Sequence, residues 1–184
     1  MHRFLFLLGS ARADGNTEYL ARQAALQLPP SAEQRWLNLA ELPLEPFVDI
    51  RHEGDGVYPS PSGNELTLLE ATLWATDIVF VSPLYWYSVT ASTKLYLDYW
   101  SGWMRVPGYS FRERMADKTV WAVTVISEED VAVADPLIGT LKRSGEYFGG
   151  RWAGALIGYA NRPGQIVEDT EALDRAKTFF TTNP

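Results

Sequence analysis

The sequence of 184 residues contains no cysteine and only two histidines, His2 and His52. The lack of cysteine excludes disulfides, thiol nucleophiles and thiolate metal sites. The two histidines lie far apart along the chain and form no metal-ligand spacing, so we predict no metal site. A Ser-His-Asp triad also lacks the G-x-S-x-G motif that would support it. We therefore predict no side chain that acts as a nucleophile or general base.

Long apolar runs and an excess of basic residues are missing as well. No apolar run approaches the roughly 18 residues that a membrane-spanning helix requires. The net charge is -7, and no basic stripe is present that would neutralise nucleic-acid phosphates. We expect a cytoplasmic protein with no membrane or nucleic-acid partner. The length suits a single domain that spans residues 1–184.

The N-terminal stretch FLFLLGSARA has two incompatible interpretations. A basic start, an apolar run and an A-x-A sequence at 11–13 are typical of a secretory signal peptide. The apolar run at 4–8 stops at Gly9, however, whereas a signal peptide needs about 7–15 apolar residues. Cleavage after Ala13 would also remove a strand that the rest of the fold requires. We favour a short buried strand that leads into a polar loop.

Strand-like and helix-like patterns alternate along the chain. Short apolar runs predict strands at 3–8, 35–39, 77–82, 118–126 and 152–160. Helical spacing and capping residues predict helices at 16–28, 64–75, 90–100, 135–148 and 169–180. Alternation of this kind indicates an α/β fold with helices on both faces of a parallel sheet. We predict a three-layer, doubly wound, five-stranded sheet with strand order 2-1-3-4-5, the flavodoxin-like arrangement.

The loop GSARADGNT after the first strand carries groups that suit a phosphate. Ser10, Asn16 and Thr17 offer side-chain donors, and Arg12 offers a cation. The free N–H groups and the dipole of the following helix favour an anion at the same place. The loop contains neither a Walker motif nor G-x-G-x-x-G, so a phosphomonoester is a better match than a dinucleotide. The alternative is an ordinary strand-to-helix turn with capping residues.

The segment SPLYWYSVTASTK follows the third strand, which neighbours the first in the predicted sheet. Tyr85, Trp86 and Tyr87 form an aromatic triplet where a ligand crevice is expected. A planar ring can stack on such a segment, although the triplet can also fill the core or a subunit interface. A ligand with a phosphate at one end and an aromatic ring at the other accounts for both loops.

These two segments together resemble the flavodoxin-like NAD(P)H-dependent FMN reductase and quinone reductase family. By resemblance, the FMN phosphate loop is formed by Ser10, Arg12, Gly15, Asn16 and Thr17. The ribityl and ring segment is formed by Pro83, Leu84, Tyr85, Trp86, Tyr87 and Ser88, while Lys94 and Asp98 match helix positions that we interpret as structural.

The resemblance implies an enzyme that binds FMN non-covalently and takes hydride from NADH or NADPH. It passes electrons to a small acceptor such as a flavin, a quinone or a nitro- or azo-aromatic compound. The cofactor carries the redox chemistry in such enzymes, which fits a chain with few histidines and no cysteine. The alternatives are a flavodoxin-type electron carrier and a flavodoxin-like binding domain without a cofactor.

The chain departs from the family pattern at two places. Thr90 stands where the family usually has Pro, and either residue can open a helix. The loop after the fourth strand reads Ser127-Glu128-Glu129-Asp130 and lacks the glycines that are common there. The carboxylates turn outward to solvent, or they lower the flavin potential, or the site is degenerate. Ser127 can still donate to the edge of the ring.

Aromatic side chains are concentrated at the end of the third helix and in the loop beyond it, namely Tyr96, Tyr99, Trp100, Trp103, Tyr109 and Phe111. This surface is too large to leave exposed. We expect it to lie in a homodimer interface, with burial inside the monomer as the alternative. Long loops at 46–63 and 102–117 are expected to control substrate access.

Overall fold

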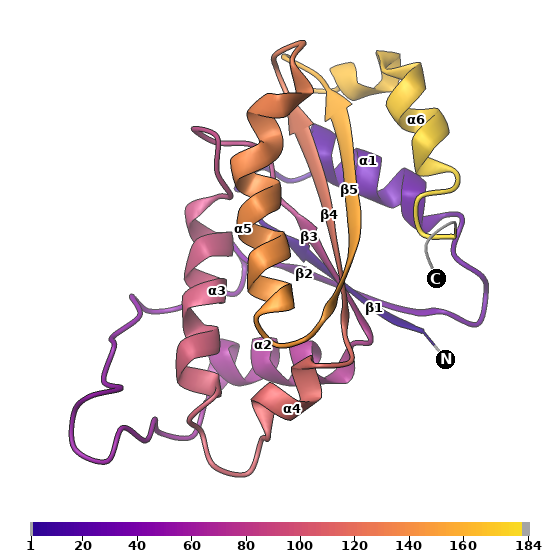
Figure 1. Cartoon of the computed structure of the whole chain (residues 1–184). Coiled ribbons are helices and arrows are strands. Elements are labelled where there is room, and N and C mark those ends of the chain that lie inside the picture. Colours follow the sequence, from indigo (N-terminus) through magenta and orange to yellow (C-terminus); the bar gives the residue numbers. More distant parts are fainter. Residues whose placement is uncertain (1, 182–184) are drawn as a thin grey trace.

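The computed structural model describes residues 2–181 and contains five parallel strands in the order β2-β1-β3-β4-β5 (Figure 1). The predicted α/β fold and strand order are therefore confirmed. The strands are β1 (Arg3–Leu8), β2 (Glu33–Asn38), β3 (Asp77–Val81), β4 (Thr119–Ile126) and β5 (Arg151–Tyr159). The helices are α1 (Asn16–Ala25), α2 (Gly63–Trp74), α3 (Ala91–Trp103), α4 (Phe111–Met115), α5 (Asp135–Glu146) and α6 (Thr170–Ala176), with short 3-10 turns η1 (Val131–Ala134) and η2 (Gln165–Glu168).

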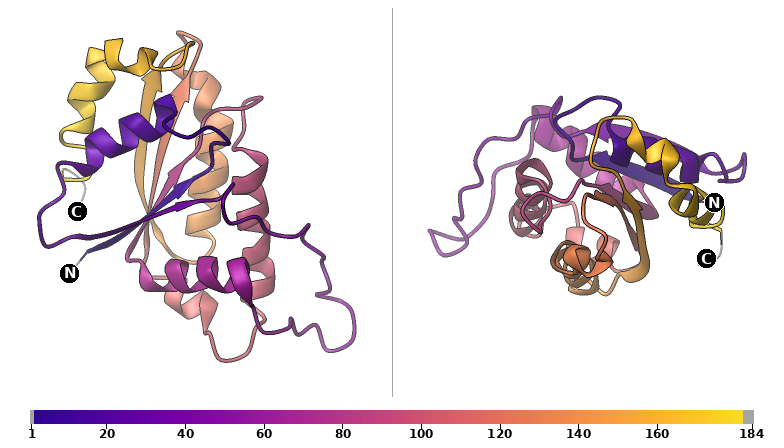
Figure 2. Two further views of the ribbon diagram at one scale, coloured as in Figure 1. Left: turned by 180° about the vertical axis from the view of Figure 1, so that it is seen from behind. Right: turned by 90° about the horizontal axis from the view of Figure 1, so that it is seen from above.

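Helices cover both faces of the sheet, as the two views of Figure 2 show. Side chains of β1 alternate between the faces, because successive residues of a strand point in opposite directions. Leu5 and Leu7 pack in the core under α2, α3 and α5, whereas Phe4 and Phe6 pack in the core under α1 and α6. Since β1 pairs in register with both β2 and β3, the strand predicted at 3–8 is confirmed as a central strand.

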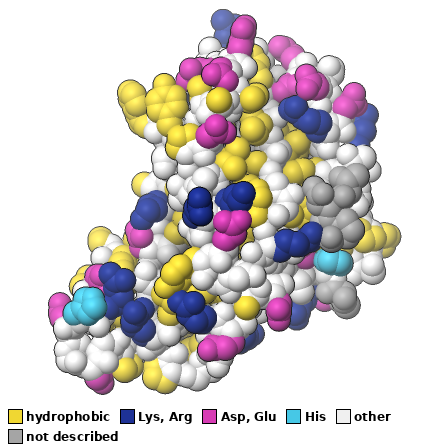
Figure 3. All heavy atoms as spheres, in the orientation of Figure 1, with side chains coloured by type: hydrophobic (Ala, Val, Ile, Leu, Met, Phe, Trp, Pro, Cys, Tyr) yellow, Lys and Arg dark blue, Asp and Glu magenta, His cyan; other side chains and the backbone are white. Residues whose placement is uncertain are grey.

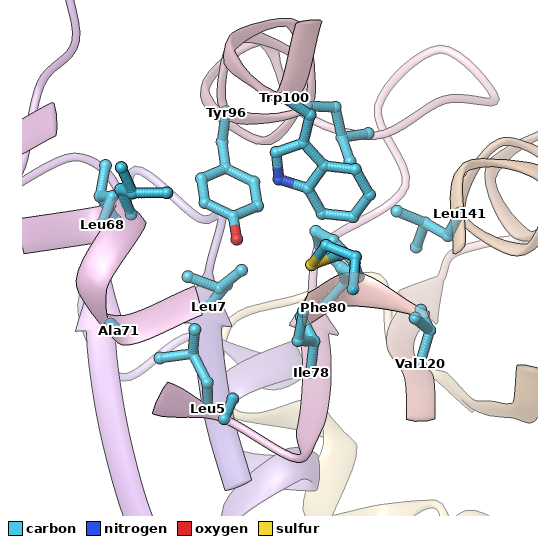
Figure 4. Packing of buried hydrophobic residues seen from close by; sticks show 14 of the residues in the cluster. Leu5, Leu7, Leu68, Ala71, Ile78, Phe80, Tyr96, Trp100, Val120 and Leu141 are labelled. Carbon is cyan, nitrogen blue, oxygen red and sulfur yellow. The ribbon is translucent and has the colours of Figure 1, made fainter. Parts of the chain in front are cut away.

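The aromatic residues at the end of α3 and beyond are buried inside this chain. Tyr96, Trp100, Trp103 and Phe111 are at most 3 % exposed, and their rings pack against one another. Figure 4 shows Tyr96 and Trp100 pointing from α3 toward the sheet. Tyr96 Oη lies 2.6 Å from Thr72 Oγ1, and burial raises the pKa of this phenol. The expected burial in a homodimer interface is wrong for these four side chains, because the core of the monomer already covers them.

Several predicted helices are shorter in the structure. α1 ends at Ala25 and α6 at Ala176, because the next residues close i to i+3 turns, such as Leu28 N–H to Ala25 O. α4 was not predicted and lies in the segment expected to be a loop, where Phe111 and Met115 bury one helical face. Within residues 2–181, no helix has both the length and the apolar character needed to cross a bilayer.

A buried lysine closes the C-terminal end of α2. Lys118 is 4 % exposed, and its Nζ donates hydrogen bonds to the carbonyl oxygen of Leu73, at 3.3 Å, and to that of Ala75. Carbonyls at a helix end have no intrahelical donors, so the ammonium satisfies them. Burial, together with the nearby charges of Arg114 and Arg3, lowers the pKa of Lys118 to about 8.

Lys118→Met should remove a pH dependence of folding. The folded protein releases this proton near pH 8 and the unfolded chain near 10.5, so the unfolded state binds more protons between these values. Stability contributed through Lys118 therefore rises with pH across this window and is smallest below pH 8. From about pH 7.5 to 9.5, the free energy of unfolding of the wild type should rise by about 2 kcal/mol relative to that of the variant in urea titrations. Parallel pH profiles for the two proteins would contradict this role.

Candidate functional site

A cavity of about 300 Å³ opens where β1, β3, β4 and β5 end. It is the place expected for a ligand in an open parallel sheet, since the strand order reverses beside β1 and β3. Nine of the eleven site residues predicted from the sequence line it, namely Ser10, Arg12, Gly15, Asn16, Thr17, Pro83, Leu84, Tyr85 and Ser127. Trp86 and Tyr87 are not among the lining residues.

The amino end of α1 lies at this cavity without a capping side chain. Gly15 holds the N-cap position and makes no side-chain cap, and the N–H groups of Asn16 and Thr17 belong to the unpaired first turn. Ser10 Oγ accepts a hydrogen bond from Arg12 N at 3.0 Å, which leaves its own proton for another acceptor. Among residues 2–181, the exposed Arg12 guanidinium has no hydrogen-bond or ion-pair partner. These donors and the helix dipole favour an anion.

Gly9 allows the loop after β1 to pack directly on the start of α3. Its N–H donates to Val81 O at 2.9 Å, and its carbonyl accepts from Ser92 Oγ at 3.2 Å. A Cβ at this position would lie 2.2 Å from Thr93 Oγ1 and 2.8 Å from Thr90 Oγ1. Thr90 caps α3 by accepting a hydrogen bond from Thr93 N at 3.3 Å. The contact between the two ligand loops therefore depends on the missing side chain of Gly9.

The aromatic triplet after β3 forms a tight two-residue turn. Tyr85 and Ser88 exchange backbone hydrogen bonds of 3.0 and 3.1 Å. Trp86 and Tyr87 between them have φ values of 49° and 63°, which cost non-glycine residues about 1–2 kcal/mol each. Tyr85 lines the cavity, whereas the Trp86 side chain is 94 % exposed. Hydrophobic side chains gather at the upper left of Figure 3, where this turn projects in Figure 1.

The acidic loop after β4 keeps its carboxylates out of the cavity lining. Ser127 lines the cavity, while Glu128, Glu129 and Asp130 are exposed and do not line it. Asp130 Oδ1 instead accepts a hydrogen bond from Ala132 N at 2.9 Å and caps η1. Of the three alternatives for this loop, the structure supports carboxylates that face solvent.

Residues 160–163 after β5 also line the cavity and were not predicted. Asn16 Nδ2 donates to Arg162 O at 2.8 Å and so joins this loop to α1. Gln165 Oε1 accepts hydrogen bonds from Asn161 N and Arg162 N at 2.9 and 3.1 Å. The parallel sheet itself was the missed signal, because it places the end of β5 at the same edge as the ends of β1 and β3.

The long loops at 46–63 and 102–117 contribute no residue to the cavity lining. These loops, which the sequence led us to expect at the substrate entrance, therefore do not border this cavity. α3 explains this placement, because it begins beside Gly9 and runs to the lower end of the molecule in Figure 1, where α4 follows. The chain that follows α3 is thus carried away from the cavity.

The lining fits a phosphate ester that carries a flat ring, as FMN does. Donors and the Arg12 cation gather at the amino end of α1, whereas Pro83, Leu84 and Tyr85 supply apolar and aromatic surface. Asn16 Oδ1 is buried and has no hydrogen-bond partner within residues 2–181, so it can accept from a ligand hydroxyl. The volume lies at the lower end of the range for pockets that bind small ligands.

Comparisons with known proteins agree with this geometry. Residues 2–136 match the family model described as NADPH-dependent FMN reductase. The protein YwqN of Bacillus subtilis (strain 168), described as an NAD(P)H-dependent FMN-containing oxidoreductase, is 28 % identical over 169 residues, which are 91 % of each chain.

Solved structures show the same fold. The Trp repressor binding protein from Bacillus subtilis superposes with a TM-score of 0.76 at 24 % identity and covers 98 % of this chain and 99 % of its own. Azoreductase from Bacillus anthracis str. Sterne gives a TM-score of 0.68 at 18 % identity, with 97 % and 98 % covered.

The family model spans well over half of the 184 residues. The resemblance predicted from the two loops is therefore confirmed, and with it the class of NAD(P)H-dependent oxidoreductases that use FMN. The chain belongs to the NADPH-dependent FMN reductase family.

Proposed function

We propose that this protein holds FMN non-covalently in the cavity at the ends of β1, β3, β4 and β5 and transfers hydride from NAD(P)H to a small acceptor. One observation carries the proposal. The uncapped amino end of α1 and the apolar segment that contains Tyr85 meet in a single cavity. Membership in the FMN reductase family supports it independently.

The residues of this chain bind and orient the cofactor. The N–H groups of Asn16 and Thr17, the Ser10 hydroxyl and the Arg12 guanidinium would hold the phosphate, because all four border the uncapped helix end. Pro83, Leu84 and Tyr85 would exclude water from one side of the ring, and Ser127 would donate to its polar edge. When bound, FMN supplies the hydride-accepting and electron-transferring chemistry.

We propose an aromatic acceptor, a quinone or an azo compound. The Tyr85–Ser88 turn supports this choice because it places Tyr85 in the cavity lining beside the exposed Trp86 ring. Aromatic side chains at a rim favour flat aromatic ligands by stacking. The structure of an azoreductase also shares this fold.

Three solution outcomes separate the candidate functions. The purified protein is loaded with FMN, and the absorbance of NADH or NADPH is followed with a soluble benzoquinone or an azo dye. Oxidation of NAD(P)H that depends on both FMN and acceptor supports the proposal. Bound FMN without NAD(P)H oxidation indicates the electron carrier, and no FMN binding indicates the binding domain without a cofactor.

Arg12→Ala should weaken FMN binding by about 1–3 kcal/mol, because it removes a charge-assisted contact to the phosphate. Riboflavin, which lacks the phosphate, should bind both proteins equally. Quenching of flavin fluorescence during titration measures both affinities. Arg143→Ala on α5 is the matched control, since it makes the same change in net charge outside the cavity lining. Equal FMN affinity in the wild type and Arg12→Ala would remove Arg12 from the site.

A further inference from the structure

A second cavity, of about 290 Å³, lies between the loop after β2 and the C-terminal end of α3. Its lining includes Phe47, Tyr58, Glu65, Tyr99 and Gly102. Gly102 is twelve residues after Thr90, so a helix rise of 1.5 Å per residue places this cavity about 18 Å from the start of α3, where the FMN cavity lies. The two cavities share no lining residue.

Three aromatic rings form the walls of this second cavity. The rings of Phe47 and Tyr58 are nearly parallel, with an angle of 6° and centroids 5.9 Å apart, and Tyr99 stands at 62° to Phe47. All three side chains are half-buried. Tyr58 is held at both ends. Its ring packs so closely on Gly102 that a Cβ there would lie 3.0 Å from it, and its Oη accepts a hydrogen bond from Ile50 N at 3.0 Å. The walls are therefore held in place by the loop and by α3.

The charge of the lining is uniformly negative. Glu45 and Glu65 both line the cavity, and its lining contains no Lys, Arg or His. Neither carboxylate forms an ion pair with a described residue, and Arg51 on the same loop is held by Asp49 at 2.5 Å. Glu65 Oε1 accepts a hydrogen bond from Trp103 Nε1 at 3.0 Å, which fixes the direction of this carboxylate.

Two groups that line this cavity have raised pKa values, chiefly because they are partly buried. Burial raises the pKa of Glu65, although the hydrogen bond from Trp103 partly opposes this effect. Burial, followed by the charges of Glu65 and Glu45, raises the pKa of Tyr99. A cation in the cavity would relieve both effects, because it would stabilise the carboxylates.

From the rings and the carboxylates together, we propose that this cavity binds a small organic cation with an ammonium head group. The faces of aromatic rings attract cations, and aromatic cages lined in this way bind quaternary ammonium groups. Glu65 and Glu45 would complement the charge, while the apolar rings would contact the methyl or methylene groups around the nitrogen. A neutral ligand of the same shape would gain only the apolar contacts.

Choline and its uncharged isostere 3,3-dimethylbutan-1-ol test the proposal, because they differ in charge but hardly in shape. Each is titrated into the full chain, and NMR follows the indole N–H of Trp103, assigned through Trp103→Phe. We expect saturable choline binding that is about tenfold tighter than binding of the isostere. The affinity should be the same with and without FMN, since the two cavities are separate.

Two substitutions on α2 and one ring variant sharpen the test. Glu65→Gln keeps an acceptor for Trp103. It should weaken choline binding about fivefold and leave the affinity for the isostere unchanged. Glu70 is exposed on the same helix and does not line the cavity, so Glu70→Gln should change neither affinity. Phe47→Leu should also weaken choline selectively. Equal affinities for the two ligands, or no saturation at about 50 mM choline, would overturn the proposal.

Discussion

Riboflavin should bind this protein about a thousandfold more weakly than FMN, although the two molecules differ only in the terminal phosphate. The α1 amino end offers the N–H groups of Asn16 and Thr17, the free proton of Ser10 and the unpaired Arg12 cation. Charge-assisted hydrogen bonds are each worth about 1.5–3 kcal/mol. After the cost of removing water from a dianion, a net difference of about 4 kcal/mol remains, which corresponds to the stated ratio.

Titration of the apoprotein with each flavin, followed by flavin fluorescence, gives the two dissociation constants. The ratio should fall in about 1 M salt, because screening weakens an exposed charge such as Arg12. Riboflavin binding should change little under the same conditions. Similar dissociation constants for the two flavins at low salt would show that the loop after β1 is an ordinary turn, the alternative left open by the sequence.

The pattern of the sequence was sufficient for the fold and for two of the loops that line the cavity. Apolar runs such as DIVFV mark strands that are buried on both faces, and α/β alternation then indicates a parallel sheet. The five predicted strands and five predicted helices favour the order 2-1-3-4-5, which the structure has. Gly9 and Thr90 are informative for a related reason. Gly9 directly follows β1 and Thr90 caps α3, and the structure places the two residues side by side next to the cavity.

Other features depend on contacts between distant residues, which a local pattern does not contain. The turn at Trp86 and Tyr87 has positive φ values but contains no glycine or asparagine, so the sequence does not predict it. Backbone hydrogen bonds between Tyr85 and Ser88 hold this conformation. Trp103 is buried inside the monomer and donates a hydrogen bond to Glu65, 38 positions away. Composition shows that such aromatic surface must be covered, but the covering element is known only from the three-dimensional arrangement.

Gly9→Ala should destabilise the protein by about 3 kcal/mol and weaken FMN binding at least about tenfold. The new Cβ would lie 2.2 Å from Thr93 Oγ1 and 2.8 Å from Thr90 Oγ1, and both threonines are buried. Relief requires movement of the loop after β1 or loss of the cap on α3. Either change separates the groups that would hold the phosphate from those that would hold the ring. Urea denaturation gives the first quantity and flavin titration the second.

The matched control is Gly139→Ala on α5, where a Cβ would meet nothing within 4 Å. That change should leave FMN binding unaltered and stabilise the helix by about 0.5–1 kcal/mol. The double variant Gly9→Ala/Thr93→Ala removes the nearer of the two clashing oxygens. It should therefore be more stable than the sum of the single variants predicts, by about 1 kcal/mol or more. Strict additivity would mean that the Thr93 hydroxyl is not what makes a Cβ at Gly9 unfavourable, and the close contact between Gly9 and the start of α3 would not be what requires a glycine here.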